Sequence, residues 1–160
     1  EDKVSYTKPL LRKSLPGYDI KATDEDFPTY CINPKSTQAN LVIFTYGAML
    51  EETISAIDEL LLEDIIPCIV CPTSLSPINL DQLEKSLKTS RNLLFIEEGS
   101  RRTSLSSEVI AALNEHKVDY NLVGRVSNEN IIPCDKRREL KFVPNSLNLH
   151  ERIIEIVNGS

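Results

Sequence analysis

Two charged pairs, Glu97-Glu98 and Arg101-Arg102, are the residues of this chain best placed to do chemistry. They follow the apolar run Leu93–Ile96, which predicts a buried strand, and ligands of α/β proteins gather at the carboxyl ends of strands. Adjacent carboxylates can divide the roles of general acid and base when their pKa values separate. Neighbours on a strand point to opposite faces, however, and one carboxylate can instead cap the backbone donors of a following helix while the other is solvated. We therefore favour a structural role for the two glutamates over catalysis.

The two arginines allow similar alternatives. Their guanidinium groups could bind a carboxylate or phosphate, or could pair with the neighbouring glutamates or with a partner subunit. We favour an interface or structural pairing. Glu97, Glu98, Arg101 and Arg102 are therefore candidate interface contacts, and we assign no catalytic, cofactor-binding or metal-binding residue.

The cysteines and histidines offer a weaker case for chemistry. The pair Cys68-x-x-Cys71 lies in the sequence Ile-Ile-Pro-Cys-Ile-Val-Cys-Pro, which predicts a strand. Residues three apart on a strand point to opposite faces, so the two sulfurs should diverge rather than share a metal or form a redox pair. His116 and His150 are isolated, and no Ser/His/Asp arrangement can be assembled from them. We expect four reduced, mostly buried cysteines.

Composition excludes several classes of function. The 160 residues are 41% hydrophobic and carry a net charge of −6, which suits one globular domain and argues against nucleic acid as a partner. No apolar stretch is long enough for a membrane span, and the charged start Glu1-Asp2-Lys3 predicts the cytoplasm, with an organelle matrix as the alternative. The five glycines are too dispersed for a dinucleotide or P-loop motif. Lys136-Arg137-Arg138 is either a solvated face or a docking patch for an acidic partner.

Two regions of the sequence differ in proline content and in the periodicity of their apolar residues. Residues 1–36 hold four of the nine prolines and show no amphipathic period, which predicts an extended arm or linker. Residues 37–160 alternate between short apolar runs and helical periods, which predicts a parallel sheet with helices on both faces. The expected fold is a three-layer α/β/α sandwich with a mostly parallel sheet of about five strands. The expected strands are 41–45, 65–70, 93–96 and 120–126, and the expected helices are 49–62, 81–88, about 105–115 and 149–157.

A series of motifs in this regular region resembles the transketolase C-terminal domain family, and within it most closely the β subunit of pyruvate and branched-chain 2-oxo acid dehydrogenases. The motifs are weak singly, but their order and spacing are specific. They are Leu41-Val-Ile-Phe-Thr-Tyr-Gly47, Leu75-Ser-Pro77, Phe95-Ile-Glu-Glu-Gly99, Glu108-Val-Ile-Ala111, Arg125-Val126 and Pro133. Two departures stand out: Cys71-Pro72-Thr73-Ser74 replaces an Asp-Leu-Arg-Thr run, and Ser104-Leu105 replaces a Gly-Gly pair.

The resemblance implies a larger enzyme. Glu1-Asp2-Lys3-x-x-Tyr6 is similar to the end of a pyrimidine-binding domain, so residues 1–36 would be its last segment and the inter-domain linker. The full enzyme would use thiamin diphosphate and magnesium, whose Gly-Asp-Gly…Asn motif does not occur here, and this fragment would bind no cofactor and would not be catalytic alone. Its partners would be the other domains and subunits of the E1 heterotetramer and the lipoamide acyltransferase core. The alternatives are the C-terminal domain of a transketolase or deoxyxylulose-phosphate synthase, and a free-standing α/β module that binds a small ligand.

Overall fold

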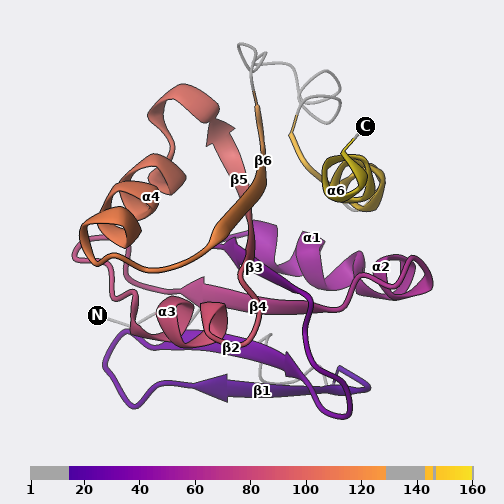
Figure 1. Cartoon of the computed structure of the whole chain (residues 1–160), viewed down its shortest axis with the longest axis horizontal. Helices are drawn as coiled ribbons and strands as arrows, with labels where there is room; N and C mark the ends of the chain where they lie inside the picture. Colours follow the sequence, from indigo (N-terminus) through magenta and orange to yellow (C-terminus); the bar gives the residue numbers. More distant parts are fainter. Residues whose placement is uncertain (1–14, 129–142, 146, 160) are drawn as a thin grey trace, which may run out of the picture.

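The computed structural model describes residues 15–128, 143–145 and 147–159. Within this part of the chain, six strands form one sheet in the order β1-β2-β4-β3-β5-β6 (Figure 1). The strands are β1 (Tyr18–Ala22), β2 (Thr29–Pro34), β3 (Leu41–Thr45), β4 (Pro67–Pro72), β5 (Asn92–Ser100) and β6 (Asn121–Asn128). The helices are α1 (Met49–Ser55), α2 (Ile57–Leu62), α3 (Asp81–Leu87), the 3₁₀ helix η2 (Arg101–Thr103), α4 (Leu105–Glu115) and α6 (Leu149–Asn158).

The four strands from β3 to β6 are parallel and form the part of the sheet that the apolar runs predicted. Every residue of β3 and of β4 is buried, as expected for strands that are covered on both faces. The parallel pairing brings the carboxyl ends of β3, β5 and β6 to one edge of the sheet. Residues that end these strands can therefore meet, although they are far apart in the sequence.

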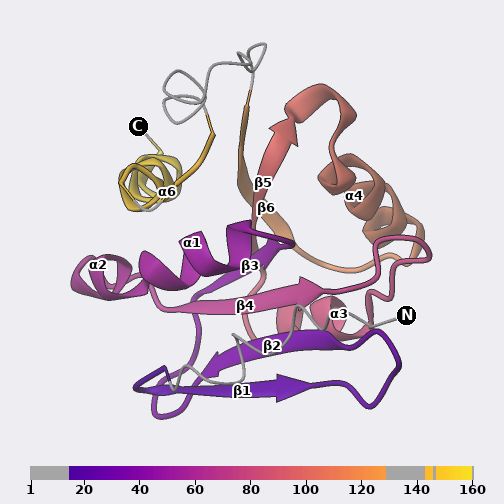
Figure 2. The ribbon, with the colours of Figure 1, turned by 180° about the vertical axis from the view of Figure 1, so that it is seen from behind.

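Helices cover both faces of the sheet, which confirms the predicted three-layer sandwich (Figures 1 and 2). On one face, α1, α2 and α6 pack against strand residues that include Ile43, Ile69 and Leu94. On the other face, α3 and α4 pack against the alternate residues, among them Phe44 and Phe95, whose rings meet edge to face at 5.5 Å between centroids. Because side chains alternate between the two faces of a strand, each strand contributes residues to two separate cores.

Residues 18–34 are not the irregular arm that the sequence predicted. They form the antiparallel hairpin β1–β2, and β2 pairs antiparallel with β4, so the sheet has six strands rather than about five. Periodicity missed this hairpin because β1 buries few of its residues and Pro28 and Pro34 bracket β2.

The expected helix 49–62 is divided in two at Ala56. Thr53 Oγ1 donates to Met49 O at 2.7 Å and Ser55 Oγ donates to Glu51 O at 2.9 Å, and such bonds to the carbonyl four residues earlier bend helices. The Ala56 N–H then bonds to Thr53 O, three residues back rather than four. The apolar spacing is kept across the break, so Leu50, Ile57 and Leu60 still reach the same core.

Some sequence motifs lie outside the described residues: Glu1–Tyr6, Pro133, Cys134 and Lys136–Arg138. In the described part of the chain, no helix combines the length and the apolar character that a membrane crossing requires.

Candidate interface at the carboxyl ends of the strands

Glu97 is fully buried near the end of β5, where it binds the first turn of α4. Its Oε1 accepts the backbone N–H of Ser106 at 3.0 Å, and its Oε2 accepts the Ser106 hydroxyl. Ser104, the residue before α4, makes no side-chain cap bond of its own. The carboxylate therefore takes the place of a cap, at the end of the helix where negative charge is favoured.

Tyr46, from the end of β3, completes this cluster. Its hydroxyl donates to Glu97 Oε1 at 3.4 Å. Burial, the negative charge of Glu97, the hydrogen bond to Glu97 and the charge of Glu98 together raise the pKa of Tyr46 to about 12. The phenol is thus a donor at neutral pH, and Glu97 accepts three hydrogen bonds from protein groups. The arrangement ties β3, β5 and α4 together.

A group of serines and one arginine extends the cluster toward β6. Ser104 Oγ donates to Arg101 O at 3.1 Å and lies 2.9 Å from Ser106 Oγ. Arg125 Nη1 donates to Ser107 Oγ at 3.0 Å, while its buried Nε has no partner among the described residues. The sequence alone predicted no contact for Arg125, because that contact depends on the pairing of β6 with β5.

The structure separates the four predicted interface residues into one buried and three exposed side chains. Glu97 points inward, whereas Glu98, Arg101 and Arg102 are exposed. The exposed residues lie at the tip formed by the end of β5 and η2, which projects beyond the neighbouring strand β3 (Figure 1). This division agrees with the interpretation that one glutamate caps a helix while the other is solvated.

Cys68 and Cys71 lie on opposite faces of β4, each in a different core, so the prediction that their sulfurs diverge is confirmed. Three described cysteines, Cys31, Cys68 and Cys71, are free and buried. Among the described residues, no group of three or more His, Cys, Asp and Glu side chains could hold a metal ion. His116 instead ends α4, and its Nδ1 lies 2.6 Å from Glu84 Oε1.

Comparison with known proteins decides the family. Residues 32–135, well over half of the chain, match the family described as "Transketolase, C-terminal domain". The chain belongs to the transketolase C-terminal domain family. This family match covers the end of β2, the parallel strands and the capped helix α4, so the site described above lies within it.

Relatives of known sequence are β subunits of pyruvate dehydrogenase. The chain is 28% identical over 124 residues to the pyruvate dehydrogenase E1 component subunit beta of Porphyra purpurea, which covers 76% of this chain and 38% of that subunit. It is 27% identical over 84 residues to the Bacillus subtilis subunit, covering 52% of this chain and 26% of that subunit. The chain therefore spans well under half the length of these relatives.

Solved structures of low sequence identity show the same fold. A split-gene transketolase, described as an inactive β4 tetramer, has a TM-score of 0.63 at 20% identity, covering 76% of this chain and 40% of that one. A 2-oxoglutarate:ferredoxin oxidoreductase from Magnetococcus marinus has a TM-score of 0.52 at 13% identity, covering 94% of this chain and 21% of that one.

Proposed function

We propose that this chain is the C-terminal, subunit-assembly domain of a thiamin-diphosphate-dependent 2-oxo acid dehydrogenase, of the E1 β-subunit type. The observation that carries the proposal is the different placement of the charged residues at the end of β5. Glu97 is buried and caps α4, while Glu98, Arg101 and Arg102 are exposed at the tip. A site built for catalysis would leave a titratable group facing a cavity. This one leaves charges facing outward, as at the rim of a protein interface.

The relatives support the type of enzyme. Proteins named as pyruvate dehydrogenase β subunits align with most of this chain, and the related transketolase is described as a tetramer. In the full enzyme the reaction would be oxidative decarboxylation of a 2-oxo acid with transfer to lipoamide. The partners of this domain would be the other domains and subunits of the E1 heterotetramer and the lipoamide acyltransferase core, in the cytoplasm or an organelle matrix.

The described residues do not fit a thiamin diphosphate site. Its magnesium would need a set of oxygen ligands, and neither the Gly-Asp-Gly…Asn motif nor an acidic cluster of three occurs in the described part of the chain. The cofactor would therefore belong to other parts of the full enzyme.

Isothermal titration with thiamin diphosphate is the first test of this proposal. The chain alone is expected to show no saturable binding, and tight binding would overturn the assembly function.

Charge reversal at the tip is the second test. Arg101→Glu with Arg102→Glu, introduced into the parent enzyme, should weaken subunit assembly in sedimentation velocity, because two cations of the interface become anions. The matched control is Lys88→Glu with Arg91→Glu, which reverses two exposed charges near the opposite end of β5. Assembly that is equally sensitive to both pairs would contradict a specific role for the tip.

A transketolase-type enzyme is the second candidate, and the structural similarity to a split-gene transketolase favours it. The two candidates differ in a partner. A dehydrogenase-type parent should bind a lipoamide acyltransferase core in a pull-down with purified components, whereas a transketolase-type parent should not.

A further inference from the structure

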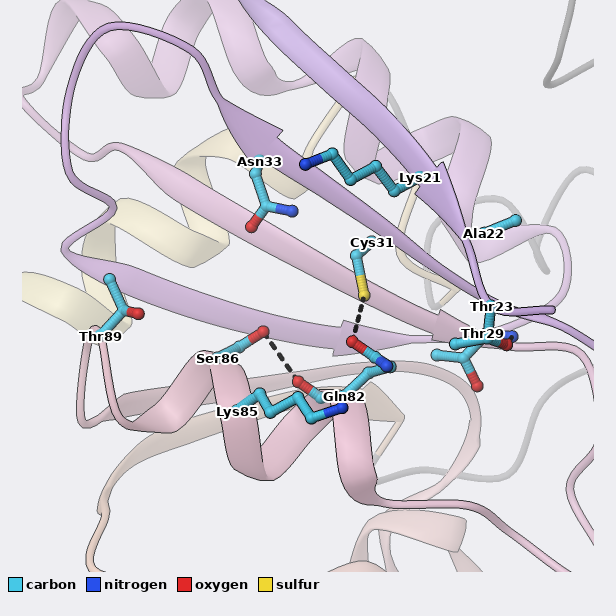
Figure 3. A pocket seen from close by; sticks show the side chains of 10 residues that line it. All are labelled: Lys21, Ala22, Thr23, Thr29, Cys31, Asn33, Gln82, Lys85, Ser86 and Thr89. Atoms are coloured by element: carbon cyan, nitrogen blue, oxygen red, sulfur yellow. Dashed lines mark hydrogen bonds between the residues drawn. The ribbon is translucent and has the colours of Figure 1, made fainter.

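A cavity of about 390 Å³ lies between the hairpin β1–β2 and helix α3, away from the tip of β5 (Figure 3). Its volume falls within the range of small-molecule sites. The sheet supplies Lys21, Cys31 and Asn33, and the helix supplies Gln82, Lys85 and Ser86. Hydroxyls of three threonines complete the polar lining. The cavity is thus walled by two elements that the chain brings together only when it folds.

The charge of this cavity is opposite to that of the chain. Lys21 on β1 and Lys85 on α3 stand on opposite walls, with Cys31 between them in Figure 3. No Asp or Glu lines the cavity, although the whole chain has a net charge of −6. Asp19, two residues before Lys21 on β1, is paired with Lys35 at 3.5 Å. Within the described residues, neither wall lysine has an ion-pair partner.

Two buried thiols orient the amide groups of the cavity. Cys31 Sγ donates to Gln82 Oε1 at 3.8 Å, and Cys68 Sγ donates to Asn33 Oδ1 at 3.1 Å. Burial raises the pKa of Cys31 to about 11 and raises that of Cys68, so both thiols keep their protons at neutral pH. Because each amide oxygen is occupied by a thiol, each amide presents its N–H donors to another partner. No such partner occurs among the residues that the structure describes.

We propose that this cavity binds a small, multiply charged anion, either a phosphate monoester or a polycarboxylate. Two ammonium groups on opposite walls and two amide N–H groups between them are all donors, and such an anion has several acceptor oxygens to meet them. The lysines act as point charges, while the N–H donors of the two amides, whose oxygens accept from the thiols, would orient the bound anion. The site is independent of the tip of β5 and of the assembly function proposed above.

Isothermal titration of the whole chain at constant ionic strength tests the proposal. The probes are inorganic phosphate, glycerol 3-phosphate and citrate, with glycerol as the uncharged comparison. Saturable binding of at least one anion, and none of glycerol, is expected. Tightest binding of glycerol 3-phosphate identifies a phosphate monoester site and tightest binding of citrate identifies a polycarboxylate site. Binding of inorganic phosphate as tight as that of either larger anion would contradict an organic ligand, and absence of saturable binding for all three anions overturns the site.

Three variants locate the binding. Lys21→Gln and Lys85→Gln should each weaken anion binding roughly tenfold, because each removes one charge-assisted hydrogen bond. Lys88→Gln is the matched control, since Lys88 is also an exposed lysine near the end of α3 but does not line the cavity. An equal loss in the control would show non-specific charge attraction and would overturn the proposal.

Gln82→Glu tests the amide separately. It keeps an acceptor for the Cys31 thiol but replaces the N–H donors with negative charge, so the anion should bind at least tenfold more weakly while the thermal midpoint is kept. Unchanged affinity in a folded variant would contradict the role of the oriented amides.

Discussion

At the scale of single residues, the pair Glu97-Glu98 shows how position decides the function of identical side chains. Both follow the same apolar run, yet Glu97 is fully buried against Ser106 and Glu98 is exposed. The alternation of side chains along β5 accounts for the difference. A buried carboxylate needs hydrogen-bond partners, and the first turn of α4 supplies them.

Glu97→Gln should lower the free energy of unfolding by about 1–3 kcal/mol, because one oxygen that accepts a buried bond becomes an N–H donor facing other donors. Urea denaturation followed by circular dichroism measures the change. Glu98→Gln is the matched control and should stay within about 0.5 kcal/mol of the parent. A Glu97→Gln variant more stable than the parent would instead indicate a strained functional carboxylate.

Tyr46 should make the stability of the fold depend on pH in the alkaline range. Its pKa is about 12 in the fold, above its ordinary value of 10.0, so the fold favours the neutral phenol. The stability that it contributes is therefore present below pH 10 and is lost as the pH rises toward 12. In Tyr46→Phe this part of the loss should disappear. Tyrosinate absorbance of the parent minus the variant should titrate near pH 12, and a midpoint near 10 would contradict the buried contact.

The sequence could predict the candidate residues but not their partners. Glu97 and Glu98 stand out because they follow an apolar run. Arg125 could not be connected to Ser107 in advance. That contact requires the parallel register of β6 against β5, in which Arg125 lies opposite Phe95, and no local pattern encodes it.

At the scale of elements, β6 and α6 pack more closely than ordinary side chains would allow. A Cβ added at Gly124 would lie 2.5 Å from Ile156 Cγ2. The absence of a side chain at this strand position therefore sets the distance between the border of the sheet and the last helix. Apolar periodicity predicted both elements, but the reason for a glycine between them appears only when they meet.

Gly124→Ala should lower the free energy of unfolding by about 1–3 kcal/mol through overpacking, as measured by urea denaturation. Gly99→Ala is the control, because an added Cβ there meets no described atom within 4 Å, and it should change stability by about 0.5 kcal/mol or less. Adding Ile156→Ala to Gly124→Ala should cost less than the sum of the two single changes. Strict additivity would show that the two residues do not touch.

At the scale of the whole molecule, the hairpin β1–β2 belongs to the same packed body as the parallel strands. Ile32 of β2 is fully buried in the core that α1, α2 and α6 cover, and β2 closes the side of β4 that β3 leaves open. The sequence predicted a linker for residues 1–36 because the prolines and acidic residues of this region obscure the apolar pattern of β2. This strand nevertheless buries four of its six residues. Where a domain boundary falls in the parent protein stays a prediction.

Ile32→Ala should therefore reduce the free energy of unfolding of the whole domain by about 2–5 kcal/mol, the cost of a cavity in a shared core. Phe27→Ala, in the turn between β1 and β2, removes a larger side chain that is 68% exposed and should cost about 0.5 kcal/mol or less. Urea denaturation followed by tyrosine fluorescence and by circular dichroism measures both variants. Coincident transitions would show one cooperative unit. A neutral Ile32→Ala variant would mean that the hairpin is attached to the domain without stabilising it.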